Sequence, residues 1–130
     1  MIKVLIDTSI WSDILRKDYD SPHEETVSNF INTGRVVIIG AIRQELLSGI
    51  KNENSFKKLK KYLRSFEDVD LISEDYEIAA DFYNKCRGKG VQGSHIDFLI
   101  CAVAHRRNHI IFTADNDFKR FKKHLEIELF

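Results

Sequence analysis

The chain alternates between short apolar runs and longer segments in which apolar residues recur at helical spacing. The short runs are rich in Val, Ile and Leu, which is typical of strands buried on both faces of a parallel sheet. The longer segments begin near Ser, Thr, Asp or Pro, and several end near Gly, as helices usually do. Strands are predicted at residues 2–6, 36–39, 69–72, 109–112 and 125–127, and helices at 10–15, 22–33, 41–50, 55–66, 73–87, 94–107 and 118–123.

This alternation predicts one α/β domain that spans residues 1–130. We expect three layers, α/β/α, around a central and mainly parallel sheet of about five strands. A chain of 130 residues buries about two thirds of its unfolded surface and needs no disulfide to fold. Cys86 and Cys101 fall in predicted helices without a Cys or His at ligand spacing, so we expect free thiols in a reducing compartment.

Charge and hydropathy narrow the possible partners. The twenty basic and twenty acidic residues cancel to a formal net charge of zero, so a nucleic acid would have to be bound by local patches. No apolar stretch approaches the roughly 20 residues of a membrane span, and Asp7 interrupts the first apolar run. We therefore expect a cytoplasmic protein that does not bind membranes.

Two acidic residues follow predicted strands. Asp7 comes directly after the first strand, and Asp115 comes just after the strand at 109–112. Ligands of open parallel sheets bind beyond the carboxyl ends of the strands, so both carboxylates are placed where a site should form. The alternative for either residue taken alone is a helix cap.

Two further acidic residues lie on predicted helices beside apolar neighbours. Glu45 is three residues after Ile42, so we expect it on the stripe that this helix turns toward the core. Asp97 is three residues after Ser94, which is the spacing of a capping box with Asp in place of Glu or Gln. The alternatives are a buried salt bridge for Glu45 and simple capping for Asp97.

Together these carboxylates predict a site for a divalent cation. Two unit charges about 4 Å apart repel by about 4 kcal/mol at an effective dielectric constant of 20, and a cation relieves this better than protonation does. Ligands that are all oxygen favour one or two Mg²⁺ or Mn²⁺ ions over zinc. Such a centre suits phosphodiester hydrolysis. The hydroxyls that could orient ligands or hold metal-bound water belong to Thr8, Ser9, Ser94 and Thr113.

The same segments resemble the PIN-domain family, and in particular the VapC toxins of VapBC toxin–antitoxin modules. Four segments carry the resemblance: Val-Leu-Ile-Asp-Thr-Ser with Asp7, Ile-Arg-Gln-Glu-Leu-Leu-Ser-Gly with Glu45, Ser-His-Ile-Asp-Phe-Leu-Ile-Cys-Ala-Val-Ala with Asp97, and Ile-Ile-Phe-Thr-Ala-Asp-Asn-Asp-Phe with Asp115 and Asp117. They keep the family's order and spacing over essentially the whole chain. Either Asp115 or Asp117 could be the inner ligand, because Asp117 could instead cap the helical turn that follows.

The resemblance implies an enzyme, a Mg²⁺- or Mn²⁺-dependent endoribonuclease that is the toxin of a type II toxin–antitoxin system. Its catalytic, metal-binding residues would be Asp7, Glu45, Asp97 and Asp115, with Asp117 as a further ligand. The resemblance also implies a structured RNA substrate such as tRNA or rRNA, a VapB-like antitoxin that blocks the pocket, and often a homodimer.

Other residues are candidates for contacts with these partners. His95 lies beside the expected pocket. A basic helix face at residues 57–64 could follow RNA phosphates or simply be solvated. Trp11, Tyr62 and Phe66 could form an antitoxin groove or belong to the core. The basic residues nearest in sequence to Asp97 and its helix, which could contact RNA phosphates, are Arg87, Lys89, Arg106 and Arg107.

Three other functions fit part of the pattern. A phosphohydrolase of the haloacid dehalogenase type also opens with an Asp after its first strand, but it needs an acid two residues later, where this chain has Ser9. A PIN-like module could bind RNA without cutting it. A receiver-like signalling domain would need an acidic pair before its phosphoacceptor, and the helical positions of Glu45 and Asp97 do not fit that arrangement.

Overall fold

The computed structural model describes residues 1–130 and contains one sheet of five short strands. The order of the strands is β3-β2-β1-β4-β5, and every neighbouring pair is parallel. The predicted α/β sheet is therefore confirmed, and it is parallel throughout. The strands are β1 (Val4–Ile6), β2 (Val36–Ile38), β3 (Glu67–Asp68), β4 (Ile110–Phe112) and β5 (Glu128–Leu129).

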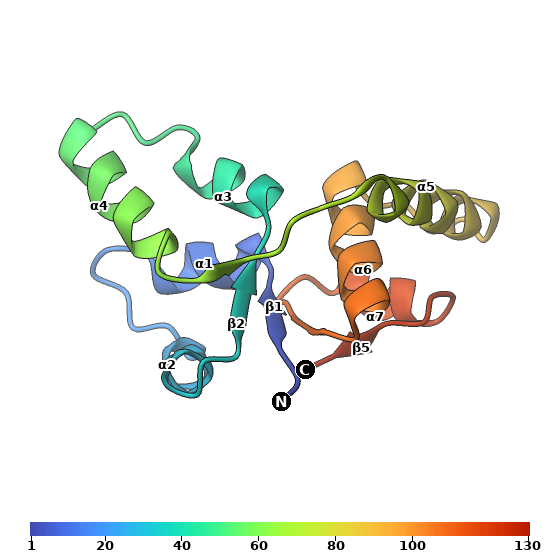
Figure 1. Cartoon of the computed structure of the whole chain (residues 1–130), viewed down its shortest axis with the longest axis horizontal. Helices are drawn as coiled ribbons and strands as arrows, with labels where there is room; N and C mark the ends of the chain where they lie inside the picture. The colour runs from blue at the N-terminus through green and yellow to red at the C-terminus, as the bar shows by residue number, and fades with distance from the viewer.

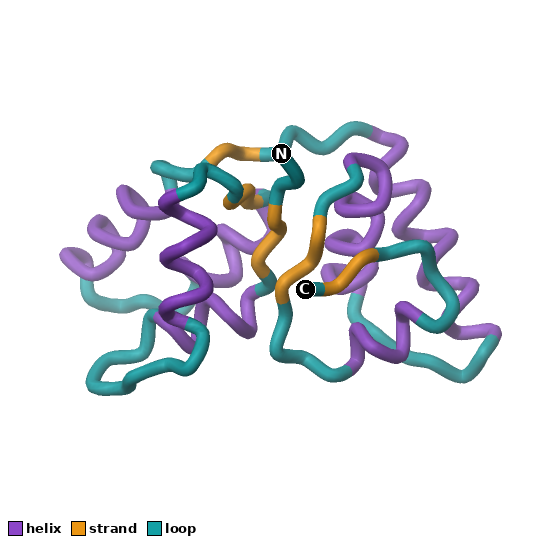
Figure 2. Tube along the Cα trace, turned by 90° about the horizontal axis from the view of Figure 1, so that it is seen from below, coloured by secondary structure: helices purple, strands orange, loops and turns teal.

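Seven helices cover the sheet in two groups. Figure 1 shows α1–α4 on one side of the strands and α5–α7 on the other, and in Figure 2 the strands form a narrow band between these groups. The predicted arrangement of three layers is confirmed. The helices are α1 (Thr8–Ile14), α2 (Glu24–Asn32), α3 (Gly40–Leu47), α4 (Glu53–Leu63), α5 (Ser73–Gly88), α6 (His95–Arg107) and α7 (Asp117–Lys122).

The two edge strands lie a few residues from their predicted positions. The strand predicted at 69–72 is formed by Glu67 and Asp68, and the strand predicted at 125–127 by Glu128 and Leu129. An edge strand pairs on one side only and does not need an apolar run, and both residues of β3 are exposed. The apolar residues at 125 and 127, which indicated the last strand, are buried in the core instead.

The direction in which successive strands are added to the sheet reverses between β1 and β4, although the strands themselves are parallel. From β1 the chain continues outward to β2 and β3, whereas from β4 it continues outward to β5 on the opposite side. The carboxyl ends of strands at such a reversal form the usual ligand site of a parallel sheet. Ile6 pairs with Phe112, and the Asp7 N–H donates to the Phe112 carbonyl at 2.9 Å. Asp7 and Thr113 therefore leave the sheet next to each other.

Helix α6 is the most apolar helix of the fold. Residues 98–104 are all buried, between the sheet and the long helix α5. This continuous burial explains why the helix has no clear amphipathic pattern in the sequence. No helix of the structure combines the length and the apolar character that crossing a membrane requires.

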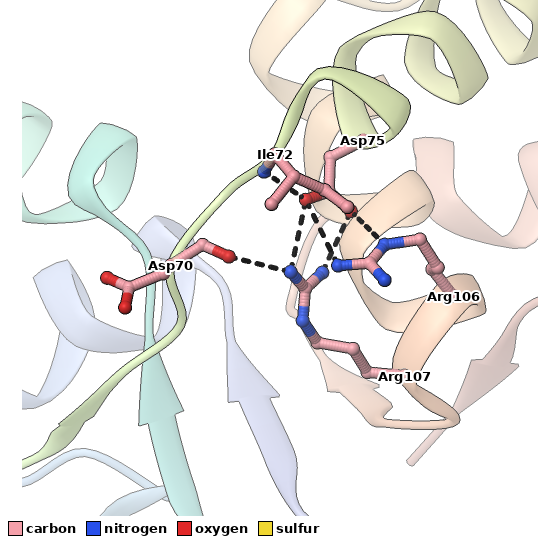
Figure 3. Close-up of polar contacts among 5 residues, drawn as sticks. All are labelled: Asp70, Ile72, Asp75, Arg106 and Arg107. Atoms are coloured by element: carbon pink, nitrogen blue, oxygen red, sulfur yellow. Dashed lines mark hydrogen bonds and ion pairs between the residues drawn. The ribbon is translucent and has the colours of Figure 1, made fainter.

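A buried carboxylate joins the beginning of α5 to the end of α6 (Figure 3). Asp75 accepts hydrogen bonds from Arg106 Nε at 2.8 Å, Arg107 Nη1 at 2.8 Å and the Ile72 N–H at 2.8 Å. Arg107 also donates to the Asp70 carbonyl at 2.8 Å, which fixes the segment between β3 and α5. Burial alone would raise the pKa of Asp75, but its hydrogen bonds with the two arginines and Ile72 bring the pKa well below its usual range.

Candidate active site

Asp7 occupies the N-cap position of α1, yet its carboxylate does not cap the helix. Its Oδ2 accepts hydrogen bonds from Ser9 Oγ at 2.7 Å and Thr113 Oγ1 at 2.8 Å. The residue is only 6% exposed, and no basic side chain pairs with it. The helix-cap alternative for Asp7 is therefore wrong, and the structure leaves its Oδ1 available to a ligand.

Two hydroxyl groups hold Asp7 in this orientation. Ser9 Oγ and Thr113 Oγ1 lie 3.3 Å apart, and both contact the same carboxylate oxygen. Ser9 Oγ also accepts a hydrogen bond from the Ala114 N–H at 3.0 Å, and Thr113 Oγ1 accepts one from the Asp115 N–H at 3.0 Å. The loop after β4 is thus tied to the beginning of α1, and Asp7 is fixed before any ligand arrives.

Glu45 reaches the same region from α3, but it is not buried as predicted. Ile42 and Leu46 on the same helix are buried, whereas the Glu45 side chain is exposed. The expectation that Glu45 lies on the core stripe is wrong, because the residue sits at the edge of that stripe where its carboxylate stays in water. Thr8 Oγ1 donates to Glu45 Oε1 at 3.0 Å, which holds Glu45 against the residue that follows Asp7.

Asp97 both caps α6 and faces the other acids. The Ser94 N–H donates to Asp97 Oδ2 at 3.0 Å, and the Asp97 N–H donates to Ser94 Oγ at 3.1 Å, so the predicted capping box is present. Burial raises the pKa of Asp97, and the nearby carboxylates of Asp7 and Asp115 raise it further, against the hydrogen bonds from Ser94 that lower it. Asp7, Asp97 and Asp115 therefore share one electrostatic neighbourhood.

Asp115 and Asp117 occupy different environments. Asp115 Oδ1 accepts the Asp117 N–H at 2.9 Å, and its charge acts on Asp97. The Asp117 carboxylate forms an ion pair with Arg120 on α7. Asp115 is thus the acid that shares the neighbourhood of Asp7 and Asp97, while Asp117 is engaged with a surface arginine.

The arginines at the end of α6 lie away from these acids. Arg106 and Arg107 both bind Asp75, at the opposite end of the helix from Asp97. About ten residues of helix, or about 15 Å, separate them from Asp97. Arg106 and Arg107 were predicted to contact RNA because they are close to Asp97 in the sequence. In the structure they bind Asp75 instead. Arg87 and Lys89, in contrast, form no ion pair and are exposed.

The aromatic candidates divide between the core and the surface. Trp11 is fully buried, so it belongs to the core rather than to a groove. Tyr62 remains 39% exposed, and Phe66 packs against Trp11 with 5.3 Å between ring centroids. Sequence reasoning missed Tyr83, whose ring stacks on that of His95 at the start of α6. Its spacing from Arg87, one helical turn further along, could have indicated it.

The acidic residues suit a hydrated divalent cation better than a closed protein cage. No three His, Cys, Asp or Glu side chains are arranged to hold a metal ion by themselves. Mg²⁺ usually takes one or two carboxylates and keeps several water ligands, which such an open arrangement allows. The available ligands around Asp7 are carboxylate and hydroxyl oxygens, which are the donors that Mg²⁺ and Mn²⁺ prefer. The residues therefore fit the predicted ion.

Comparisons with known proteins agree with this fold. A chain of VapBC2 from Rickettsia felis, bound to a DNA fragment from its promoter, is similar to this chain with a TM-score of 0.79 and 20% identity. The match covers 100% of this chain and 98% of that one. VapBC-1 from nontypeable Haemophilus influenzae gives a TM-score of 0.79 at 20% identity, covering 100% and 97%. VapBC-5 from Mycobacterium tuberculosis gives 0.70 at 17%, covering 99% and 98%. At these identities the structures establish the fold alone.

The sequence itself identifies the family. No curated protein sequence matches the chain. The family model of the PIN domain matches residues 4–124, which include all of the acidic candidates. A match over nearly the whole chain excludes the haloacid dehalogenase and receiver alternatives, neither of which shares this family. The chain belongs to the PIN-domain family.

Proposed function

We propose that this PIN domain is a metal-dependent endoribonuclease and the toxin of a type II toxin–antitoxin system. The observation that carries the proposal is a buried carboxylate, Asp7, with other acids around it and no basic partner. Asp7 lies at the carboxyl ends of β1 and β4, where the strand order reverses and where parallel sheets bind their ligands. The toxin assignment is supported by the VapBC complexes that share the fold.

Asp7 differs from the other buried acid of the molecule in having no basic partner. The only two buried charged residues are Asp7 and Asp75. Asp75 is neutralised by Arg106 and Arg107, as a buried charge must be. Asp7 has hydroxyl partners only, and the acids near it add charge of the same sign. A divalent cation supplies the missing positive charge.

The chain's residues divide into ion-holding and orienting groups. Asp7, Glu45, Asp97 and Asp115 would hold one or two Mg²⁺ or Mn²⁺ ions together with water ligands, since no three of them are arranged to hold an ion by themselves. A bound ion supplies positive charge for the phosphoryl oxygens and lowers the pKa of a water molecule. The hydroxyls of Ser9 and Thr113 orient the Asp7 carboxylate, that of Thr8 orients Glu45, and the Ser94 backbone N–H orients Asp97, through hydrogen bonds of 2.7–3.0 Å. The substrate would be a structured RNA such as tRNA or rRNA.

Cleavage of total cellular RNA by the purified chain tests the function. We expect cleavage with Mg²⁺ or Mn²⁺ and none with EDTA. Folded protein that cuts no RNA with any divalent ion would reject the nuclease and leave a module that only binds RNA. Cleavage that persists in EDTA would reject the metal mechanism.

Paired substitutions separate Asp115 from Asp117. Asp115→Asn is expected to lower RNA cleavage by more than about 100-fold, because this acid belongs to the neighbourhood of Asp7 and Asp97 and is proposed to hold the ion. Asp117→Asn removes only an ion pair with Arg120 near the surface and should leave cleavage within about threefold of wild type. The rates are measured on one RNA substrate at saturating Mg²⁺. Equal losses would show that both acids serve the ion.

We also propose that a VapB-like antitoxin binds this chain and covers the groove between α1, α3 and α4. This groove has a volume of about 650 Å³ and combines apolar residues with three cations. An antitoxin segment with an apolar face and acidic flanks would fit it. Its lining includes Leu15, Leu46, Ile50, Leu59 and Tyr62, with Arg16, Lys17 and Lys58.

Coexpression with any small open reading frame that lies next to the gene tests the partner. The product is expected to copurify with the chain and to inhibit its RNA cleavage. The mass of the purified chain in solution tests the homodimer that the proposal also includes. A neighbouring product that neither binds nor inhibits would leave a PIN nuclease outside toxin–antitoxin systems.

A further inference from the structure

An exposed stack of planar side chains lies at the N-terminal end of α6, the end that also carries Asp97. The rings of Tyr83 on α5 and His95 at the start of α6 are stacked, with centroids 5.1 Å apart and planes 16° apart. The guanidinium carbon of Arg87 lies 5.5 Å from the Tyr83 ring centroid. Beneath the stack, the buried ring of Phe98 meets Tyr83 edge-on at 5.6 Å and 76°. His95 and Arg87 are exposed, so the stack presents planar surface to solvent.

The backbone before α6 fixes the position of His95. A Cβ atom at Gly93 would lie 2.5 Å from Cζ of Phe121 and 3.0 Å from the Phe98 ring, so the chain runs tightly against the core there. His95 follows the N-cap residue Ser94 and precedes Asp97 by two positions. The stack is therefore held at the same end of α6 as an acid of the active site.

His95 also borders an apolar hollow between α5 and α6. The hollow has a volume of about 320 Å³, at the lower end of the range of about 300–1,000 Å³ that small-molecule sites occupy. Five of its six lining residues are hydrophobic. A flat aromatic group that stacked on His95 would find apolar contacts at its side. The lining residues are Tyr76, Ala79, Ala80, His95, Ile96 and Leu99.

The charges around the stack favour an anionic partner. Lys85, on the same helix, is paired with Asp81, but Arg87 and Lys89 have no acidic partner. Both cations are exposed at the end of α5, and Arg87 lies against the Tyr83 ring of the stack. An acidic site repels phosphates, so free cations close to it are where an RNA backbone would be held.

We propose that His95, supported by Tyr83, is a stacking platform for one unpaired base of the RNA substrate, with Arg87 and Lys89 contacting the flanking phosphates. This inference rests on the proposed nuclease function. Single-stranded RNA is commonly recognised by stacking of splayed bases on aromatic rings, histidine and arginine planes. The platform selects RNA whose cleaved bond lies next to an unstacked base, as in a loop or a bulge.

Substitutions of His95 test the platform. The probe is a short, dye-labelled, mixed-sequence single-stranded RNA, whose affinity is measured by fluorescence anisotropy in EDTA and whose cleavage is measured with Mg²⁺. His95→Ala should raise Kd and KM by about 5- to 150-fold, the range for loss of one stacked base, while kcat changes little. His95→Phe keeps a stacking ring and should restore most of the affinity. His124→Ala, at another exposed histidine, is the matched control.

The outcomes separate the platform from the nuclease function. Wild-type protein that does not cut RNA, combined with weaker binding by His95→Ala, would reject the nuclease and keep the platform. Cleavage by wild type, with His95→Ala matching His124→Ala in both Kd and KM, would overturn the platform. The apolar face could instead join two copies of the chain. A dimer that His95→Ala converts to monomer, with the affinity for RNA per chain unchanged, would overturn the platform as well.

Discussion

Replacing Asp97 with asparagine is expected to abolish RNA cleavage and to stabilise the metal-free protein. Loss of groups that merely orient metal ligands costs about 10- to 100-fold, so loss of a ligand should cost more than about 100-fold in kcat. The raised pKa of Asp97 shows that its charge is unfavourable in the folded state, through burial and through Asp7 and Asp115. Asparagine removes that charge and can still accept the Ser94 N–H.

Cleavage assays and thermal melts in EDTA measure the two effects. Asp20→Asn, at an exposed acid without an ion pair, serves as the control and should change neither quantity. A melting temperature that rises while activity falls separates a functional acid from a structural one. If Asp97→Asn lowers both, Asp97 acts mainly as the cap of α6 and the account of its charge is wrong.

The largest effect on stability is expected for Asp75→Asn. Breaking a buried ion pair costs about 3–5 kcal/mol, and the partial exposure of the two arginines places this case near 3 kcal/mol. The matched control is Asp81→Asn on the same helix, whose surface pair with Lys85 should contribute less than about 0.5 kcal/mol. Urea unfolding at pH 7 measures both. Equal midpoints for the two variants would show that the Asp75 cluster is not structural.

The same cluster predicts how stability depends on pH. The pKa of Asp75 is lower in the folded chain than the ordinary value of about 3.9. The ionised Asp75 carboxylate therefore contributes fully to the free energy of unfolding at pH values above about 3.9. This contribution is lost as the pH falls below about 4 toward the lowered pKa. Wild type should therefore lose stability over this window more steeply than Asp75→Asn. Parallel acid titrations would contradict the assignment.

The central strands and two of the acids could be predicted because each is indicated by a short local stretch of sequence. A continuous apolar run predicts each of β1, β2 and β4. Asp7 and Asp115 were identified because they lie at or just after the carboxyl ends of β1 and β4. The edge strands were misplaced because an edge strand is held by backbone pairing and needs no apolar pattern. Glu45 was wrongly predicted to be buried, because residues at the border of a helical stripe can turn either way.

Contacts between distant residues could not be predicted from sequence. Arg106 and Arg107 seemed free because their partner, Asp75, lies about thirty residues earlier. The stack of Tyr83 on His95 likewise forms between two helices. Such pairings depend on how α5 and α6 dock, which no local pattern encodes.

Binding of Mn²⁺ tests the central claim, that a divalent cation neutralises the buried charge of Asp7. Electron paramagnetic resonance counts free Mn²⁺ in titrations of the wild-type chain and of Asp7→Asn. We expect one or two ions per wild-type chain, displaced by Mg²⁺, and a loss of this binding in folded Asp7→Asn. Equal binding by both proteins, or no binding by the folded wild type, would contradict the account.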